Sequence, residues 1–294
     1  MRLSTQTHCL AEKFGDEQAV RILAEAGYDA IDWSFFNMFD DNDVWVREGW
    51  KEHAHALRKV GDECGIAFNQ AHAPFGTSKG EEPFDTMAME RILQSIEIAS
   101  ILGIDNIIVH PKQHLPYAKN KKYLFDINVE MYKNMMPLCE KLGVRICTEN
   151  MWQYDTNRQV IIDSVCSQPE EFCAMVDAVG SPWLGACLDI GHAALVGVDP
   201  ADFIRELGHD RLKALHVHDV DHRRDCHTLP FMEKLDWASI TAALGEIDYT
   251  GDFTFEADQF LYAFPKALQP EAAKFMVKTG RYLMEQVEAN RVKG

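Results

Sequence analysis

Short apolar runs alternate with longer amphipathic segments along the chain of 294 residues. Runs such as NIIVH (106–110) and VRIC (144–147) are continuously apolar, which is typical of parallel strands covered on both faces. The segment MERILQSIEIASILG (89–103) carries apolar residues at helical spacing and ends in glycine, a common stop for a helix. The pattern predicts strand–helix units that recur about every 28 to 40 residues.

Eight segments have the composition of strands, and a helical segment follows each of them. They are RLSTQT from Arg2, YDAIDWSF from Tyr28, GIAFNQAHAPF from Gly65, IDNIIVHP ending at His110 and Pro111, VRICTEN from Val144, LGACLDIGH from Leu184, LKALHVHDV from Leu212 and DFTFEAD from Asp252. We expect a long C-terminal helix, from about Glu271 to Val292, to close the ring. This alternation predicts an α/β fold, a single (β/α)8 TIM barrel over residues 1–294, with a doubly wound open sheet as the alternative.

Length and composition agree with one soluble domain. A (β/α)8 barrel needs about 250 residues, and no linker or low-complexity stretch divides the chain. The net charge of −17 argues against nucleic-acid binding, which needs a positive surface. Eight cysteines without a C-x-x-C pair predict reduced thiols and a cytoplasmic protein. No apolar run approaches the roughly 20 residues of a membrane span, so we expect no membrane association.

Residues that can coordinate a metal lie at the ends of six consecutive predicted strands, from the third to the eighth. They are His72, His110, Glu149, Asp189 with His192, His216 with His218, and Glu256, and the loop after the seventh strand adds Asp225 and His227. The C-terminal ends of parallel barrel strands converge on one face. Three carboxylates and one imidazole, from Glu149, Asp189, His216 and Glu256, therefore predict a divalent-metal site.

Other side chains near strand ends are weaker candidates. Trp152 and Trp33 could form an apolar wall for a sugar, and core or rim packing is an equal alternative. Arg223 and Arg224 could clamp an anionic or hydroxyl-rich substrate, although a surface role fits as well. We expect only one of His216 and His218 to face the barrel axis.

These motifs together resemble the sugar phosphate isomerase/epimerase family, the xylose-isomerase-like TIM barrels. The resemblance spans roughly His72 to Asp258, and it is carried by HAPF at His72, VHP at His110, TEN at Glu149, the D-x-x-H of LDIGHA, the H-x-x-D of HVHD, D-x-H-x-x-P from Asp225, and FEAD at Glu256. It implies that Glu149, Asp189, His216 and Glu256 hold the metal, with His216 preferred to His218. It also implies that His72, His110 and His192 contact substrate, and we add Trp152, Arg223 and His227 as substrate-binding candidates.

The same superfamily includes endonuclease IV, a DNA-repair enzyme with a three-zinc site. The ligand-type residues of this chain are similar to that pattern in type and order: His72, His110, Glu149, Asp189, His192, His216, Asp225, His227 and Glu256. The net charge of −17 and the segment LPFMEKLDW (229–237), in place of a glycine-rich one, argue against a nuclease. The sequence leaves open whether His72, His110, His192 and His227 bind a sugar or further metals.

The resemblance implies a metal-dependent isomerase or epimerase acting on a sugar, ketose or polyol-derived substrate. Its reaction would remove a proton α to a carbonyl through an enediolate, with Glu149 and Glu256 as the acid–base pair. The alternatives are a metal-dependent lyase or deglycosidase of oxidised sugar-like substrates, an abasic-site nuclease, and a non-catalytic carbohydrate-binding barrel. A carboxylate-rich site favours Mn²⁺, with Zn²⁺, Co²⁺ or Mg²⁺ as alternatives. We expect a small-molecule carbohydrate partner, while a homo-oligomer or a hetero-subunit is left open.

Overall fold

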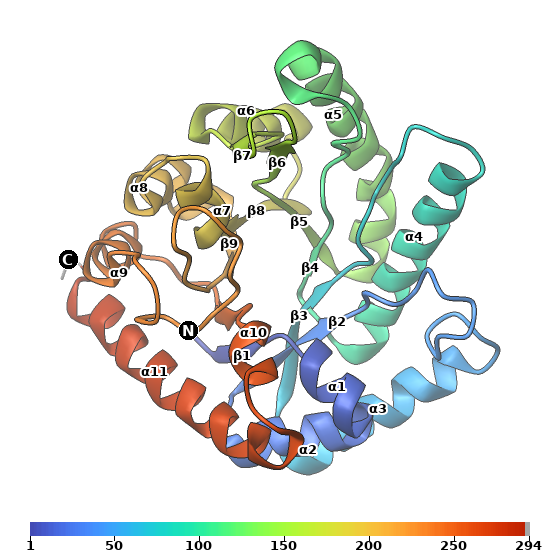
Figure 1. Cartoon of the computed structure of the whole chain (residues 1–294). Helices are drawn as coiled ribbons and strands as arrows, with labels where there is room; N and C mark the ends of the chain where they lie inside the picture. The colour runs from blue at the N-terminus through green and yellow to red at the C-terminus, as the bar shows by residue number, and fades with distance from the viewer. Residues whose placement is uncertain (292–294) are drawn as a thin grey trace.

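Eight parallel strands form a closed barrel in the computed structural model, which describes residues 1–291 (Figure 1). The barrel strands are β1 (Leu3–Thr5), β2 (Ala30–Ser34), β3 (Ala67–His72), β4 (Asn106–Ile108), β5 (Arg145–Glu149), β8 (Leu184–Asp189), β9 (Leu212–His216) and β10 (Phe253–Phe255). Six of them pair in the order β2-β3-β4-β5-β8-β9, and β1 pairs with β10. Parallel bridges from Gln6 to Asp32 and from Val217 to Phe255 close the ring. The predicted TIM barrel is confirmed, and an open sheet is excluded.

Helices surround the barrel and return the chain to the start of each next strand (Figure 1). They are α1 (His8–Phe14), α2 (Asp16–Ala26), α3 (Trp50–Cys64), α4 (Phe84–Leu102), α5 (Tyr117–Leu142), α6 (Pro169–Val179), α7 (Ile190–Leu195), α8 (Pro200–Arg211), α9 (Trp237–Glu246), α10 (Asp258–Tyr262), the 3-10 helix η1 (Lys266–Leu268) and α11 (Gln269–Ala289). Gly27 and Gly103 end α2 and α4 in the left-handed conformation, as predicted. The long closing helix is α11, and Val292 lies outside the described residues.

One element beyond the barrel was not predicted. After β5, the chain forms an antiparallel hairpin of β6 (Trp152–Asp155) and β7 (Val160–Asp163). Its strands are four residues long and only partly buried; β6 has no continuous apolar run, and the run in β7 is only three residues long. The hairpin lies beside α6 in Figure 1 and brings Trp152 to the barrel mouth.

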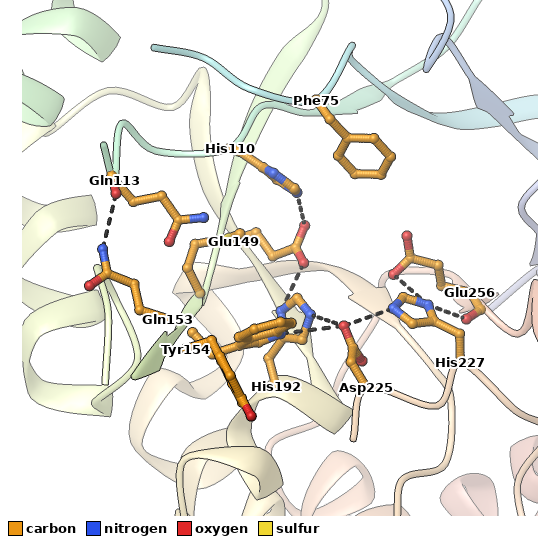
Figure 2. Close-up of a pocket in the computed structure, with 12 residues that line it drawn as sticks. Phe75, His110, Gln113, Glu149, Gln153, Tyr154, His192, Asp225, His227 and Glu256 are labelled. Carbon is orange, nitrogen blue, oxygen red and sulfur yellow. Dashed lines mark hydrogen bonds and ion pairs between the residues drawn. The ribbon is translucent and has the colours of Figure 1, made fainter. Parts of the chain in front are cut away.

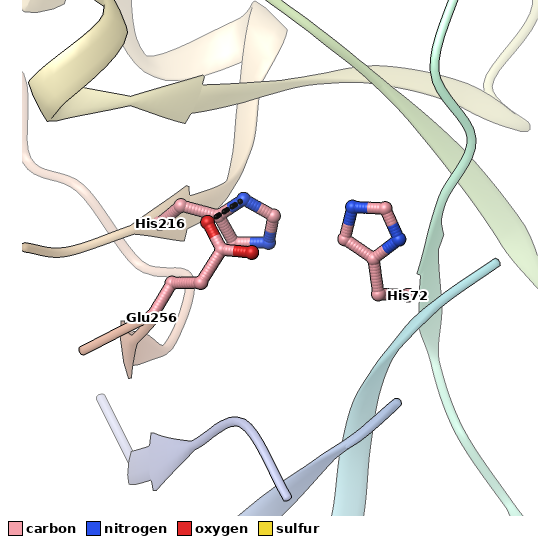
Figure 3. Close-up of side chains that lie close together, drawn as sticks. All are labelled: His72, His216 and Glu256. Carbon is pink, nitrogen blue, oxygen red and sulfur yellow. Dashed lines mark ion pairs between the residues drawn. The ribbon is translucent and has the colours of Figure 1, made fainter. Parts of the chain in front are cut away.

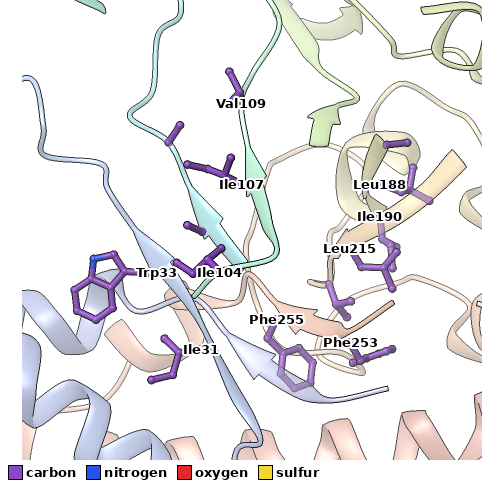
Figure 4. Packing of buried hydrophobic residues seen from close by; sticks show 14 of the residues in the cluster. Ile31, Trp33, Ile104, Ile107, Val109, Leu188, Ile190, Leu215, Phe253 and Phe255 are labelled. Atoms are coloured by element: carbon purple, nitrogen blue, oxygen red, sulfur yellow. The ribbon is translucent and has the colours of Figure 1, made fainter. Parts of the chain in front are cut away.

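Apolar side chains of the strands point outward and pack under the helices. Ile31, Ile107, Leu215 and Phe253 belong to this layer, which Figure 4 shows. Trp33 is also there, edge-on to Trp45 at 5.7 Å between ring centroids. Trp33 is therefore a core residue and forms no part of a sugar-binding wall.

The barrel interior is small and largely polar. Ile108, Cys147, Cys187 and Ala214 form a separate buried cluster inside it. Ser4 and Thr254 share a hydrogen bond of 2.8 Å, and Asn69 donates to Ser4 at 3.1 Å. All eight cysteines are free thiols. Within residues 1–291, no helix combines the length and apolar character that a membrane crossing requires.

Candidate active site and metal centre

The four predicted metal ligands meet at the C-terminal end of the barrel. Glu149, Asp189 and His216 are the last residues of β5, β8 and β9, and Glu256 directly follows β10. All four are at most 4% exposed. The Nδ1 atom of His216 lies 3.1 Å from Glu256 Oε2, 3.4 Å from Glu149 Oε2 and 4.0 Å from Asp189 Oδ2. We call these four residues the strand-end cluster.

Charges in and around the strand-end cluster shift the pKa values of its residues. Burial alone would raise the pKa of Glu149, but the positive charges of His216 and His110 outweigh it and hold that pKa well below its usual range. Burial lowers the pKa of His216, whereas Cys187, Glu256 and Glu149 raise it well above normal. Without a metal, His216 therefore carries a proton between carboxylates, in the place where a cation would be favoured.

The residues present fit a divalent cation. Both ring nitrogens of His216 are buried, and neither has a partner in hydrogen-bond geometry, even though Glu256 Oε2 lies 3.1 Å from Nδ1; buried polar atoms normally have such a partner. The donor atoms are carboxylate oxygens and imidazole nitrogen, which suit Mn²⁺, Mg²⁺, Co²⁺ or Zn²⁺. The ligand atoms of His72, His216 and Glu256 lie within 4.8 Å of one another, and Figure 3 shows His72 facing the other two.

Two histidines adjoin Glu149 on the β3 and β4 side. The Nε2 atoms of His72 and His110 are 3.0 Å apart, and His110 Nε2 is 3.1 Å from Glu149 Oε2. His72 Nδ1 is 2.7 Å from the carbonyl oxygen of Ala73, to which it donates. Both rings therefore present Nε2 to the site, where each can bind a hydroxyl group or a cation.

A second group of ligand-type residues lies on a short helix and a loop. The carboxylate of Asp225 is 3.2 Å from His192 Nε2 and 3.1 Å from His227 Nε2 (Figure 2). We call His192, Asp225 and His227 the loop cluster. His192 Nδ1 also lies 3.2 Å from Glu149 Oε1, so the two clusters adjoin. Burial alone would lower the pKa of His227, but Glu256 and Asp225 raise it to about 10.

His218 belongs to the site as well, so the expectation that only one of His216 and His218 would face it is wrong. His218 Nε2 is 3.0 Å from both carboxylate oxygens of Asp189, and its ring stacks on His227 at 4.2 Å. Residues two apart on an extended chain share a face, which explains why both histidines point inward. Gly191 permits this packing, because a Cβ atom there would lie 2.2 Å from the His218 ring.

Supporting residues around the strand-end cluster were missed in the sequence. Asp32 is fully buried on β2, with Oδ2 at 3.9 Å from His216 Nε2 and at 3.0 Å from Gln70 Nε2. Gln6 donates to Glu256 Oε1 at 2.8 Å. The signal for Asp32 was available, since a carboxylate within the apolar strand AIDWS must point into the barrel.

A cavity of about 490 Å³ opens above these clusters. It is lined by Phe75, His110, Gln113, Glu149, Met151, Trp152, Gln153, Tyr154, His192, Asp225, His227 and Glu256 (Figure 2). The lining includes four of the predicted substrate-binding residues: His110, Trp152, His192 and His227. His72 lies deeper, and Arg223 is an exposed loop residue outside the lining. Arg224 is engaged with Asp221 through Nε at 3.0 Å and is also outside it.

The fold and site define a (β/α)8 barrel with a buried carboxylate–imidazole centre at its C-terminal face. The chain belongs to the xylose isomerase-like TIM barrel family, whose profile matches residues 20–279. This confirms the resemblance inferred from the motifs.

Individual relatives are distant. The chain is 24% identical over 270 residues to fructoselysine 3-epimerase of Shigella flexneri, covering 84% of this chain and 87% of the relative. A solved D-tagatose 3-epimerase-like protein superposes with a TM-score of 0.73 and 21% identity, over 99% of this chain and 98% of the other. The IolI protein with a bound zinc atom gives a TM-score of 0.73 and 15% identity, with all of both chains covered. These likenesses to solved structures establish the fold alone.

Proposed function

We propose that this protein is a metal-dependent epimerase or isomerase of a sugar, ketose or polyol-derived carbonyl compound. The observation that carries the proposal is the pair of carboxylates, Glu149 and Glu256, which approach His216 from two different strands within one cavity. The similarity to fructoselysine 3-epimerase and to a D-tagatose 3-epimerase-like protein supports the same reaction class.

Glu149, Asp189, His216 and Glu256 would hold the metal, and we favour Mn²⁺, with Zn²⁺ next. A bound divalent cation supplies Lewis-acid stabilisation of the negative charge that develops on oxygen when a proton α to a carbonyl is removed. The zinc in the IolI structure supports a metal in this family. Substrate hydroxyl groups would be positioned by His110 and His192, which line the cavity beside Glu149.

Glu149 and Glu256 would carry the protons. Without a metal, the pKa values of both carboxyl groups are lowered, against the effect of burial, because His216 and a further histidine lie next to each. Epimerisation needs one of the two groups ionised, to accept the α-proton of the substrate, and the other protonated, to return a proton to the opposite face, so the resting pair would hold one proton between them. Epimerisation requires such a two-sided arrangement, whereas elimination by a lyase requires only the first transfer.

Two charge-neutral variants test this assignment. We expect Glu149→Gln and Glu256→Gln each to lower turnover about 10²–10⁴-fold, measured as solvent deuterium exchange at the α-carbon across a panel of ketoses. Glu271→Gln is a matched control, since Glu271 is exposed on α11 and pairs only with Lys274 in the described chain. If a Gln variant keeps its metal and full exchange activity, the two-carboxylate mechanism is wrong.

A three-metal nuclease is the second candidate, because ligand-type groups surround the site beyond the strand-end cluster. His72, His110 and Glu149 form one such group, and the loop cluster forms another. Against it stands the net charge of −17. Elemental analysis of the purified protein and a nicking assay on an abasic duplex separate the candidates. Three zinc ions per chain together with nicking would show that the protein is a nuclease and not a sugar enzyme.

A further inference from the structure

A second cavity lies at the end of the barrel opposite the strand-end cluster. Its volume is about 410 Å³, and residues at the starts of the barrel strands line it, among them Asn106 of β4, Arg145 of β5 and Lys213 of β9. Arg2 and Asp252, which directly precede β1 and β10, also belong to the lining. We call this cavity the N-terminal pocket. Active sites of TIM barrels lie at the other face, so this pocket is separate from the candidate active site.

The positive charges of the N-terminal pocket are only partly neutralised. The guanidinium group of Arg2 pairs with both acidic residues of the lining, at 2.8 Å from Asp252 Oδ2 and at 3.1 Å from Asp105 Oδ2. Arg145 and Lys213 form no ion pair with any carboxylate of residues 1–291, and the partners that they have are neutral. In a chain with a net charge of −17, the pocket is therefore a local site of uncompensated positive charge.

The neutral partners fix the positions of these two cations. Arg145 Nε donates to the carbonyl oxygen of Pro182 at 3.0 Å, and its Nη1 donates to Asn106 Oδ1 at 3.0 Å. Lys213 Nζ donates to the carbonyl oxygen of His209 at 3.2 Å. Within the described chain, Arg145 Nη2 and the remaining protons on Lys213 Nζ have no such partner, so both side chains keep donors for a ligand.

A glycine on the strand between them allows the two cationic side chains to converge. Strand β8 lies between β5 and β9, and a Cβ atom on Gly185 would lie 2.6 Å from Lys213 Cγ and 3.3 Å from Arg145 Cδ. The aliphatic parts of both side chains therefore occupy the space over Gly185. Their charges also reach the barrel interior: burial raises the pKa of Cys147 to about 12, and Arg145 and Lys213 oppose this rise. Two like charges held together without a counterion favour the binding of an anion.

We propose that the N-terminal pocket binds a small dianion of the phosphate or sulfate type between Arg145 and Lys213. Arginine binds such anions through adjacent N–H donors, and lysine binds them as a point charge. The bound anion links β5 and β9, whose other ends carry Glu149 and His216, and it stabilises the folded chain because it binds only that state. This site takes no part in the proposed reaction, so the inference holds whichever reaction the active site performs.

Calorimetric titration of the full-length protein with sodium phosphate, at constant ionic strength near neutral pH, tests this inference. We expect phosphate and sulfate to bind with dissociation constants of about 1 mM or below, and chloride not to compete. Arg145→Gln and Lys213→Gln should each weaken phosphate binding at least about tenfold, because each loses a charge-assisted hydrogen bond. Lys213→Arg should largely keep the affinity. Lys278→Gln is the matched control, since Lys278 is exposed on α11 and lies outside the pocket.

The active-site cavity is the competing location for an anion, because His192 and His227 line it. His227→Asn should leave phosphate affinity unchanged if the anion occupies the N-terminal pocket. Affinity that falls in His227→Asn, or that survives in both Arg145→Gln and Lys213→Gln, overturns the inference. Absence of phosphate binding at millimolar concentrations overturns it as well.

Thermal unfolding separates the loss of a ligand contact from misfolding of a variant. The unmodified protein and Lys278→Gln should unfold at a higher temperature in phosphate than in sodium chloride of equal ionic strength. Arg145→Gln and Lys213→Gln should keep the circular dichroism spectrum of the folded protein and show little of this rise. A rise that persists in full in both variants is a general salt effect, and it would count against an anion site.

Discussion

The strand-end cluster and the loop cluster adjoin each other but are built differently. The first stands on the ends of barrel strands, and its side chains are at most 5% exposed. The second stands on α7 and on the loop after β9, and the side chains of Asp225 and His227 are 18% and 25% exposed. A strand end is fixed by the barrel's hydrogen bonds, whereas a loop needs its own supports.

Those supports differ as well. Asp32 and Gln6 adjoin the strand-end cluster from inside the barrel. In the segment that follows the loop cluster, the buried carboxylate of Asp219 accepts hydrogen bonds from the backbone nitrogens of Phe231, Glu233 and Leu235 at 2.9–3.1 Å. The indole nitrogen of Trp237 adds a fourth at 3.1 Å. One buried carboxylate therefore holds the segment that leads from the loop cluster to α9.

The two clusters should differ most in metal retention and activity when one histidine is removed from each. We expect His216→Asn to abolish metal retention and to lower activity about 10³-fold or more, because Lewis-acid stabilisation is worth several kcal/mol. His227→Asn should retain one metal per chain and lose about 10–100-fold, as expected for a side chain that supports or orients the reacting groups. Metal content by elemental analysis and α-proton exchange measure both. Equal metal loss in the two variants would show that the clusters act as one site.

The strand-end cluster could be predicted from the sequence because each of its ligands is tied to a recognisable apolar run. Glu149 and Asp189 end continuous buried strands, and a parallel barrel leaves only one face where such ends can meet. The same logic located all eight strands. It could not locate the hairpin, whose strands are four residues long, only partly buried and outside the repeat of the barrel.

Side chains whose positions do not follow from the pattern of apolar strands were harder to predict. The position of Arg223 depends on the path of a loop, and the structure leaves it exposed. The importance of Asp219 depends on backbone donors up to 16 residues away in sequence, which no local pattern indicates. Asp32 lay within a predicted strand, but its approach to His216 requires the barrel's register to be known.

A smaller effect should follow from Asp32→Asn, which tests the support of the strand-end cluster. The carboxylate of Asp32 lies 3.9 Å from the ring nitrogen of His216 opposite the metal side, and carboxylates on that side of a ligating histidine help to orient its ring. We expect about 10–100-fold weaker metal binding in a competitive chelator titration. Asp258→Asn is the matched control: Asp258 is buried too, its pKa is raised to about 8 chiefly by burial, and its carboxylate accepts from Cys9 N. Similar losses in both variants would indicate general destabilisation and no role for Asp32 in positioning.

Per pH unit, the smallest effect is a pH dependence that the clusters share. Burial lowers the pKa of His227, but Glu256 and Asp225 raise it to about 10, so the metal-free protein holds a proton there at neutral pH. A metal that binds the loop cluster must displace this proton, and its apparent affinity should rise about tenfold per pH unit between pH 6.5 and 9. Isothermal titration in buffers of different ionisation enthalpy counts the protons released.

His227→Asn sharpens the comparison, because it should remove the loop cluster's share of the released protons and leave that of His216.

In the metal-free protein, the stability of the fold should change with pH in the opposite direction to the metal affinity, so that it falls as the pH rises. A raised pKa in the folded state stabilises the fold fully below the unfolded value of about 6.5, and this contribution is lost as the pH rises through about 10. Thermal unfolding of the metal-free protein should therefore occur at lower temperature at pH 9 than at pH 6.5, and His227→Asn should flatten that dependence. If His227→Asn keeps the pH dependence of the metal affinity that the unmodified protein shows, the loop cluster binds no metal.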